Sequence, residues 1–337
     1  MTAVLMLAAV VLDWLLGEPR RWHPLAGFGR LTAWLEQRLY LPDRLSGAFA
    51  VAVLLLPAIW LADVLAELPG LLGAAFSVWA LYFALGHQSL HGHARRIVTA
   101  LHAGDDAAAR AATACIVSRD ADSLDIVPAA CESTLENGSD GVFGALFWFL
   151  VAGAPGAILY RLANTLDATW GYKTPRYREF GWAAANLDDM LNIVPARLTA
   201  LTYVVLAGRR GRRRLSCRPA RQALACWRQQ APAWDSPNAG PVMAAGAGAL
   251  GIRLGGPARY HGEWHVRPTL GCGALPEVAD IERALALVRH GVVLWLTVIG
   301  VGAGLAGWFE FDLAAAASEW MQDWNRWLNF LRENDLA

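Results

Sequence analysis

Apolar residues along this chain gather into six long runs, separated by stretches that are rich in charged and polar residues. A helix that crosses a bilayer needs about 20 mostly apolar residues, and several of the runs approach that length. One soluble core could not bury six such helices. The pattern therefore predicts an all-α, polytopic integral membrane protein with short or broken helices and polar loops that face the cytosol. The runs cover residues 2–17, 47–65, 71–86, 142–162, 193–208 and 290–308.

The fourth run is interrupted in its middle by the sequence AGAPG, at residues 152–156. Glycine and proline both interrupt helices, and non-helical backbone is tolerated at membrane depth only where protein or water covers it. The run therefore either spans the bilayer or turns back as two half-helices, and the sequence leaves both open. A break of this kind often marks a binding site.

Composition and charge support the membrane interpretation. Hydrophobic residues make up 55% of the chain and charged residues 17%, against about a quarter charged in soluble domains. Arginines follow the first, third and fifth runs, so the positive-inside rule places these loops in the cytoplasm and the amino terminus outside. We expect a multi-pass protein of the cell inner (cytoplasmic) membrane with a cytosol-facing active site. The net charge of zero gives no indication of nucleic acid binding.

The carboxyl end differs from the rest of the chain. Residues 1–312 show no long linker and no internal repeat, so we expect one membrane-embedded domain there. From residue 313 to residue 337, tryptophans and leucines recur on one face of a helix. This pattern predicts an amphipathic helix that lies on the bilayer surface, or one that packs against a partner protein.

The first group of candidate functional residues lies in the segment 118–150. Pro128 suits the first turn of a helix and Asn137 with Gly138 suits its end. Glu132 and Glu136 would then lie on one face, close enough to share a metal ion or a substrate group. The alternative is that they form a solvated acidic face.

Two flanking features of this segment also carry charge. Asp140 follows the expected helix and could simply cap the next one. Before the helix, Arg119 and Asp120 lie in a polar turn, where a guanidinium group is suited to binding phosphate.

Further candidates lie in residues 164–192. Asp188 and Asp189 resemble a pair that holds a hard cation such as Mg²⁺, although most such pairs are surface residues. Tyr172, Tyr177 and Trp182 could stack on a large planar ligand or could be interfacial aromatics.

Two features outside the carboxylates also bear on ligand binding. Asn238 precedes a helix rich in alanine and glycine, which permits close approach either to a ligand or to another helix. Lys173 is the only lysine and stands in the sequence GYKT, so no Walker A loop is present to hold a nucleotide.

Several long motifs, in a constant order, resemble one protein family, the adenosylcobinamide-phosphate synthases (the membrane-bound CobD/CbiB family of cobalamin biosynthesis). The resemblance covers most of the chain. The motifs are LDWLLGEPRRWHPLAGFGRL (12–31), SRDADSLDIVPAACESTLENGSDGVFGALFWFL (118–150), LYRLANTLDATWGYKTPRYREFGWAAANLDDMLNIVPARLTAL (159–201), SPNAG…AGALGIRLGGPARYHG (236–262) and PTLGCGALPEVADIERALALV (268–288).

The resemblance implies an acid–amine ligase. The family joins adenosylcobyric acid, a corrinoid, to (R)-1-aminopropan-2-yl phosphate, and some relatives take ethanolamine phosphate. The product is adenosylcobinamide phosphate. The resemblance implies ATP as the driving cofactor and Mg²⁺ with it, the lipid bilayer as surroundings, and a homo-oligomer or an association with later cobalamin-assembly enzymes as further partners.

Within these motifs we assign roles by the chemistry of each side chain, since the resemblance does not settle them. The expected catalytic residues are Glu132, Glu136, Asp140 and Asp120. The expected metal ligands are Asp188, Asp189, Glu132 and Glu136. The expected substrate- or phosphate-binding residues are Arg119, His23, Asn137, Asn164, Asp167, Tyr172, Lys173, Arg176, Tyr177, Trp182, Asn238 and Tyr260.

Two other classes of membrane protein are the alternatives. A transporter should bury charges in the middle of its spans, and only Asp13 and Arg161 are good candidates, both near the ends of runs. A regulatory protein that shares the fold without the activity should lose the acidic and arginine motifs, which this chain retains.

Overall fold

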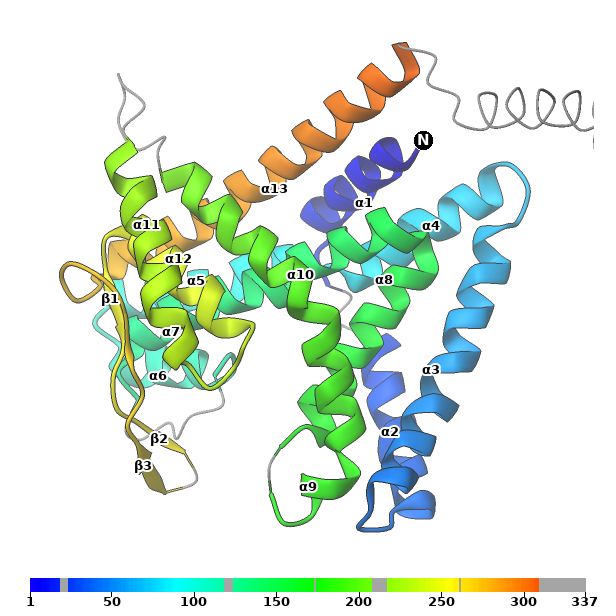
Figure 1. The fold of residues 1–337 in the computed structure, drawn as a ribbon, viewed down its shortest axis with the longest axis horizontal. Helices are drawn as coiled ribbons and strands as arrows, with labels where there is room; N and C mark the ends of the chain where they lie inside the picture. Colours follow the sequence, from blue (N-terminus) through cyan, green and yellow to red (C-terminus); the bar gives the residue numbers. More distant parts are fainter. Residues whose placement is uncertain (19–23, 118–123, 173, 208–216, 261, 309–337) are drawn as a thin grey trace, which may run out of the picture. The chain divides into compact units, whose positions relative to one another are not determined.

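The computed structural model describes residues 1–18, 24–117, 124–172, 174–207, 217–260 and 262–308 (Figure 1). Contacts divide the chain into a first unit, Met1–Trp295, and a second unit, Leu296–Ala337. The boundary falls within the last described helix. The amphipathic helix expected from residue 313 onward lies outside the described residues.

The described chain is mostly helical, and the described residues of the six apolar runs lie mainly in helices. The helices are α1 (Thr2–Leu16), α2 (Pro24–Leu39), α3 (Arg44–Ala66), α4 (Leu71–Ala84), α5 (His87–His102), α6 (Asp106–Ala114), α7 (Ile126–Gly138), the π-helical turn η2 (Ser139–Phe143), α8 (Gly144–Trp170), α9 (Tyr177–Phe180), α10 (Trp182–Ala207), α11 (Cys217–Gln230), the 3₁₀ turn η3 (Ala231–Ala233), α12 (Ala239–Leu250) and α13 (Val278–Trp308).

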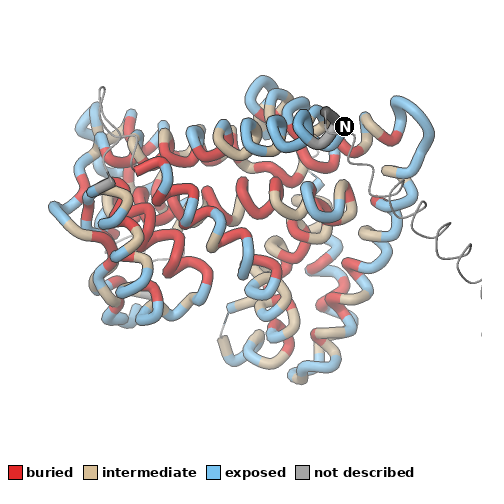
Figure 2. The backbone as a smooth tube through the Cα atoms, turned by 45° about the horizontal axis from the view of Figure 1, so that its top comes forward, coloured by how far each residue is buried: buried red, intermediate tan, exposed pale blue. Residues whose placement is uncertain are grey.

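Among the described residues, five continuous helical stretches are long and apolar enough to cross a membrane. Large apolar side chains remain exposed on them, for example Leu56 and Trp60 of α3 and Leu72 of α4. In Figure 2 the buried positions follow the inner sides of the helices and the exposed positions follow the outer sides. Lipid suits such outer surfaces, so the prediction of an all-α polytopic membrane protein is confirmed. The stretches are Arg44–Ala66, Leu71–His102, Ile126–Trp170, Trp182–Ala207 and Val278–Leu305.

The break predicted in the fourth apolar run is also confirmed. Within α8, Ala152 (φ −135°, ψ 19°) and Gly153 (φ 61°, ψ −147°) leave the helical conformation. Glycine adopts a positive φ at no steric cost, whereas most other residues do not. The break separates α8 into two segments, and the second carries the polar motif that begins at Tyr160.

The helix expected over the first acidic motif is present as α7. Pro128 lies in its first turn and Gly138 is its last residue, as predicted. Asp140, however, does not cap the next helix, because η2 continues the helical backbone from α7 into α8 and makes no side-chain cap. A π-helical turn within a longer helix is uncommon and is frequent at functional sites.

Two small antiparallel sheets, which the sequence analysis did not predict, lie between α12 and α13. Strand β1 (Arg253–Gly255) pairs with β4 (Thr269–Gly271), and β2 (Ala258–Tyr260) pairs with β3 (Glu263–His265). Leu254 and Leu270 are opposite each other and buried. These strands place the GIRLGGPARYHG motif against α7 and α12.

Helix α12 is buried along its entire length between α7, α10 and α11 (Figure 1). A methyl group at Gly246 would meet Leu135 of α7 at 2.7 Å, and one at Gly248 would meet Ala223 of α11 at 2.8 Å. Of the two alternatives for this alanine- and glycine-rich segment, the structure shows close helix packing.

Candidate functional site

A cavity of about 470 Å³ lies beside the π-helical turn. Its wall includes four carboxylate side chains, two from α7, one from η2 and one from the second segment of α8, and we call it the acidic cavity. The amide side chains of Asn137 and Asn164 also line it. The carboxylates are Glu132, Glu136, Asp140 and Asp167.

The π-helical turn brings Asp140 into a concentration of negative charge. Asp140 lies within electrostatic range of Glu136, Asp167, Asp188 and Asp189. The turn is held from the other side by the hydroxyl of Tyr160, which donates to the backbone oxygen of Asp140 at 2.9 Å. Carboxylates gathered in this way favour a cation, either a metal ion or an ammonium group.

Glu132 is engaged differently from Glu136. Its Oε2 accepts from Nη1 of Arg267 at 2.9 Å, and its Oε1 accepts from the backbone N–H of Gly255 at 2.8 Å. The two charged side chains are buried, with 2% of the Glu132 side chain and 7% of the Arg267 side chain exposed. Glu132 therefore attaches the β1–β4 sheet to α7 in addition to lining the acidic cavity.

Arg267 is a residue that the sequence analysis missed. Besides its bonds to Glu132, its Nε donates to the backbone oxygen of Gly256 at 3.0 Å, and its guanidinium carbon lies 5.1 Å from the ring centre of Trp234. The sequence did offer one signal, since Arg267 lies between two motifs of the resemblance, GIRLGGPARYHG and PTLGCG, although it belongs to neither.

A second cavity, of about 390 Å³, lies on the other side of the Glu132–Arg267 pair. Three arginines line it together with Trp264 and the glycines at 255 and 256, so we call it the arginine cavity. Because Glu132 lines both cavities, the buried ion pair forms part of the wall between an acidic and a basic compartment. The arginines are Arg253, Arg259 and Arg267.

A third cavity, of about 420 Å³, adjoins the acidic cavity and shares part of its lining. Asn137, Arg161 and Tyr172 contribute to both. Its remaining polar lining comes from Ser89 and His93 of α5 and from Glu18. We call it the adjoining cavity.

The structure separates the two carboxylates of the Asp188–Asp189 pair. Asp188 accepts from Nδ2 of Asn164 at 3.3 Å and from Nδ2 of Asn192 at 3.1 Å, and so lies next to Asn164, which lines the acidic cavity. Asp189 accepts from the side-chain amide of Asn238 through its backbone oxygen (2.8 Å) and through Oδ1 (3.3 Å). Asn238 is buried and links α10 to the start of α12.

The donor chemistry of the acidic cavity suits Mg²⁺. Within the described part of the chain, no group of three or more His, Cys, Asp or Glu side chains is arranged to hold a metal ion. Mg²⁺ is usually held through one or two carboxylates, with water and substrate phosphate as the other ligands. Glu136 and Asp140, which both line the cavity, are of the right type for that arrangement.

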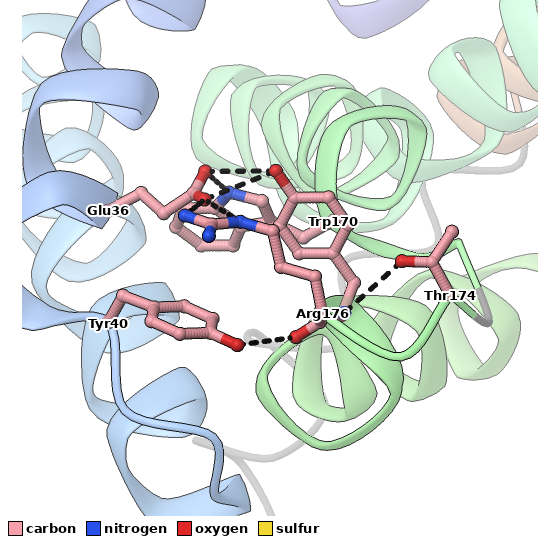
Figure 3. A network of polar contacts seen from close by, with 6 residues as sticks. Glu36, Tyr40, Trp170, Thr174 and Arg176 are labelled. Atoms are coloured by element: carbon pink, nitrogen blue, oxygen red, sulfur yellow. Dashed lines mark hydrogen bonds and ion pairs between the residues drawn. The ribbon is translucent and has the colours of Figure 1, made fainter.

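Arg176 and Tyr177 belong to a network centred on Glu36 of α2, shown in Figure 3. The Glu36 carboxylate accepts from Nε and Nη2 of Arg176 at 3.0 and 2.7 Å, from the hydroxyl of Tyr177 at 3.1 Å and from Nε1 of Trp170 at 3.1 Å. Tyr40 completes the network by donating to the backbone oxygen of Arg176 at 3.0 Å.

The Glu36 network fixes the loop after α8 to α2. Hydrogen bonds to Glu36 and Tyr177 raise the pKa of the Arg176 guanidinium above its ordinary value. The loop presents Tyr172 to the acidic and adjoining cavities. Glu36 was missed by the sequence analysis, although a carboxylate on the buried face of α2, beside Leu35, was a usable signal.

The other expected residues lie as follows. Trp182 is exposed at the start of α10, where Arg44 lies 5.2 Å from its ring centre. Arg176, Tyr177, Trp182 and Asn238 contribute to none of the three cavities. Tyr260 pairs through its backbone with Glu263, and its side chain is not described. His23, Arg119, Asp120 and Lys173 lie outside the described residues.

Comparison with known proteins identifies the family. The family model described as CobD/Cbib protein matches residues 6–288. The chain is 54% identical over 318 residues to the cobalamin biosynthesis protein CobD of Chromobacterium violaceum, which covers 91% of this chain and 98% of that protein. It is also 54% identical over 307 residues to the protein of the same name from Stutzerimonas stutzeri, with 89% and 97% covered.

A more distant relative supports the same conclusion. The cobalamin biosynthesis protein CobD of Mycobacterium tuberculosis is 43% identical over 294 residues, with 85% of this chain and 91% of that protein covered. No solved structure matches the chain. The family model and these relatives span nearly the entire first unit, including all three cavities, and the chain belongs to the CobD/Cbib protein family of cobalamin biosynthesis.

Proposed function

We propose that this protein is an adenosylcobinamide-phosphate synthase. It joins the free carboxylate of adenosylcobyric acid to the amine of (R)-1-aminopropan-2-yl phosphate or ethanolamine phosphate, with ATP consumed. The observation that carries the proposal is the placement of an acidic cavity and an arginine cavity on the two sides of one buried ion pair. Membership of the CobD/Cbib family supports the corrinoid substrate.

The chemistry needs both kinds of compartment. A carboxylate does not acylate an amine in water unless it is first activated, and ATP supplies that activation. Arginine side chains bind phosphate groups through paired, charge-assisted hydrogen bonds, which suits Arg253 and Arg259 to the phosphates. The amine substrate arrives as an ammonium ion, and a carboxylate such as Asp140 or Glu136 can hold it and remove its proton.

The same carboxylates provide for Mg²⁺. Glu136 would hold the ion together with water and the phosphate oxygens of the amine substrate, which leaves Asp140 to hold the ammonium group, and the ion would neutralise charge on that phosphate. Glu132 is the weaker candidate for this role, because its carboxylate is already bonded to Arg267 and Gly255.

We place the protein in the inner membrane with its cavities on the cytosolic side. The adjoining cavity is lined by Ser89 and His93 of α5, and Arg95 and Arg96 follow on the same helix. The positive-inside rule assigns such an arginine pair to the cytoplasm, where ATP and the amine phosphate are available. The exposed apolar helices offer a hydrophobic surface on which a bulky corrinoid can rest.

The test is product analysis with the full-length protein in detergent. Adenosylcobyric acid, ATP, Mg²⁺ and each amine phosphate in turn are supplied, and products are identified by mass spectrometry. We expect a product with the mass of the corrinoid plus the amine phosphate less one water, formed only when ATP is present. Folded protein that makes no such product from either amine phosphate would refute the proposal.

A further inference from the structure

Arg161 is a largely buried charge to which the proposed chemistry gives no role. It lies on the second segment of α8, within the helical stretch Ile126–Trp170, which is apolar enough to cross a membrane. A charged side chain in such a stretch is costly, and those that persist commonly serve a ligand or a transported ion. Its side chain is 16% exposed and lines both the acidic cavity and the adjoining cavity.

The guanidinium of Arg161 has more hydrogen-bond donors than the described residues around it accept. Its Nε is buried and has no hydrogen-bond partner among the residues that the structure describes. Arg161 also forms an ion pair with Glu18. The distance from Nη2 of Arg161 to Oε1 of Glu18 is 4.0 Å, which is too long for a hydrogen bond. Arg267, which is also buried, donates three hydrogen bonds. A buried donor without an acceptor costs about 1–3 kcal/mol. An anion bound at Arg161 would remove that cost.

The surroundings of Arg161 separate charge along one cleft. Towards the acidic cavity, Asn164 and Asp167 follow it on the same helix, and Glu136 and Asp140 face them from α7 and η2. Six residues of helix rise about 9 Å. A small molecule with an anionic group at one end and a cation at the other matches this order of charges along the cleft.

We propose that the cleft formed by the acidic cavity and the adjoining cavity binds an amino alcohol phosphate, with its phosphate monoester on Arg161 and its ammonium group towards Asp140 and Asp167. The identity of the ligand rests on the proposed function. The planar guanidinium can donate two parallel hydrogen bonds to a phosphate, which sets the orientation of the ester. The amine then lies among the carboxylates that can take its proton.

The test is direct binding by isothermal titration calorimetry, with the full-length protein in detergent and without ATP or corrinoid. The ligands are ethanolamine phosphate, 1-aminopropan-2-yl phosphate, inorganic phosphate and unphosphorylated ethanolamine. For Arg161→Gln we expect the Kd of the two esters to rise on the order of 10- to 100-fold, because charge-assisted hydrogen bonds are lost. The Kd of ethanolamine should change less than about twofold. Arg44→Gln, an exposed site on α3, is the matched control and should bind all ligands as the parent does.

Several results would overturn this assignment. One is an Arg161→Gln protein that melts like the parent and binds ethanolamine phosphate with the parental Kd. Another is parental protein that binds ethanolamine as tightly as its phosphate ester. If Arg161→Gln does not fold, Arg161→Lys keeps the charge without the paired geometry, and an unchanged Kd for that variant also counts against the proposal. If Arg161→Gln makes the amide with the parental KM for the amine phosphate, the role of Arg161 is refuted and the proposed function stands. If the ester binds through Arg161 but the protein makes no amide product, only the proposed function is refuted.

Discussion

The buried pair of Glu132 and Arg267 offers the sharpest test of how the cavities are built. Replacing Arg267 by methionine keeps much of the side-chain volume but removes the guanidinium that pairs with the Glu132 carboxylate, which is 2% exposed. Breaking a buried ion pair by removing one member costs about 3–5 kcal/mol, because the remaining charge is uncompensated. We therefore expect Arg267→Met to lower the free energy of unfolding by roughly that amount.

The double variant separates pairing from packing. In Glu132→Gln with Arg267→Met neither buried charge remains, so the loss of stability should be smaller than in either single variant. Unfolding can be followed by tryptophan fluorescence in mixed micelles with increasing denaturing detergent. Hydrogen exchange at the amide of Gly255, which donates to Glu132, should speed up in the single variants.

The exposed pair of Arg44 and Glu179 is the control for this cycle. Their side chains are 57% and 41% exposed, and surface pairs contribute about 0–1 kcal/mol. Arg44→Gln should therefore leave stability nearly unchanged. Two results would contradict a stabilising role for the buried Glu132–Arg267 pair. One is a loss of stability under about 1 kcal/mol in Arg267→Met, and the other is single effects that simply add in the double variant.

Glu136, Glu36 and Cys226 allow three further predictions. Glu136→Gln should lower turnover by about two orders of magnitude at a melting temperature in detergent close to the parental one, since glutamine keeps the shape of the side chain but loses the charge that serves the ammonium or Mg²⁺. Parental turnover would contradict this. Glu36→Gln should raise hydrogen exchange in residues 171–176, because it weakens charge-assisted hydrogen bonds, worth about 1–2 kcal/mol, that hold this loop to α2. Unchanged exchange there would argue against this role of Glu36. Burial and the neighbouring Cys272 raise the pKa of the Cys226 thiol to about 12, so little thiolate forms at pH 8. Iodoacetamide at that pH should label the exposed Cys115 and spare Cys226, as peptide mass spectrometry would show.

The long-range contacts explain why the sequence analysis selected some residues and missed others. Glu132 and Glu136 stand one helical turn apart and look alike in the sequence, and nothing near Glu132 in the chain indicates that it meets an arginine 135 positions away. Glu36 and Arg176 are 140 positions apart. No local pattern specifies which distant side chain will neutralise a charge, because that depends on how the helices pack.

The features that the sequence determined by itself are the local ones. Apolar runs became helices because the length and hydrophobicity of a segment decide its preference for a bilayer. The break at Gly153 and the end of α7 at Gly138 were predictable, since glycine and proline act on the backbone where they stand. The family was also accessible, because its motifs are continuous in the sequence.

Only the tertiary structure decided which polar groups share a cavity. It placed Asp188 against Asn164, a residue of the acidic cavity, and Asp189 against Asn238, although the two are neighbours in the chain. It also formed the small sheets that bring Arg267 to Glu132 and left Arg161 with unused donors between two cavities. The physical reason is that a charge inside a membrane protein must find a partner, a ligand or water, and the three-dimensional packing determines which of these it meets.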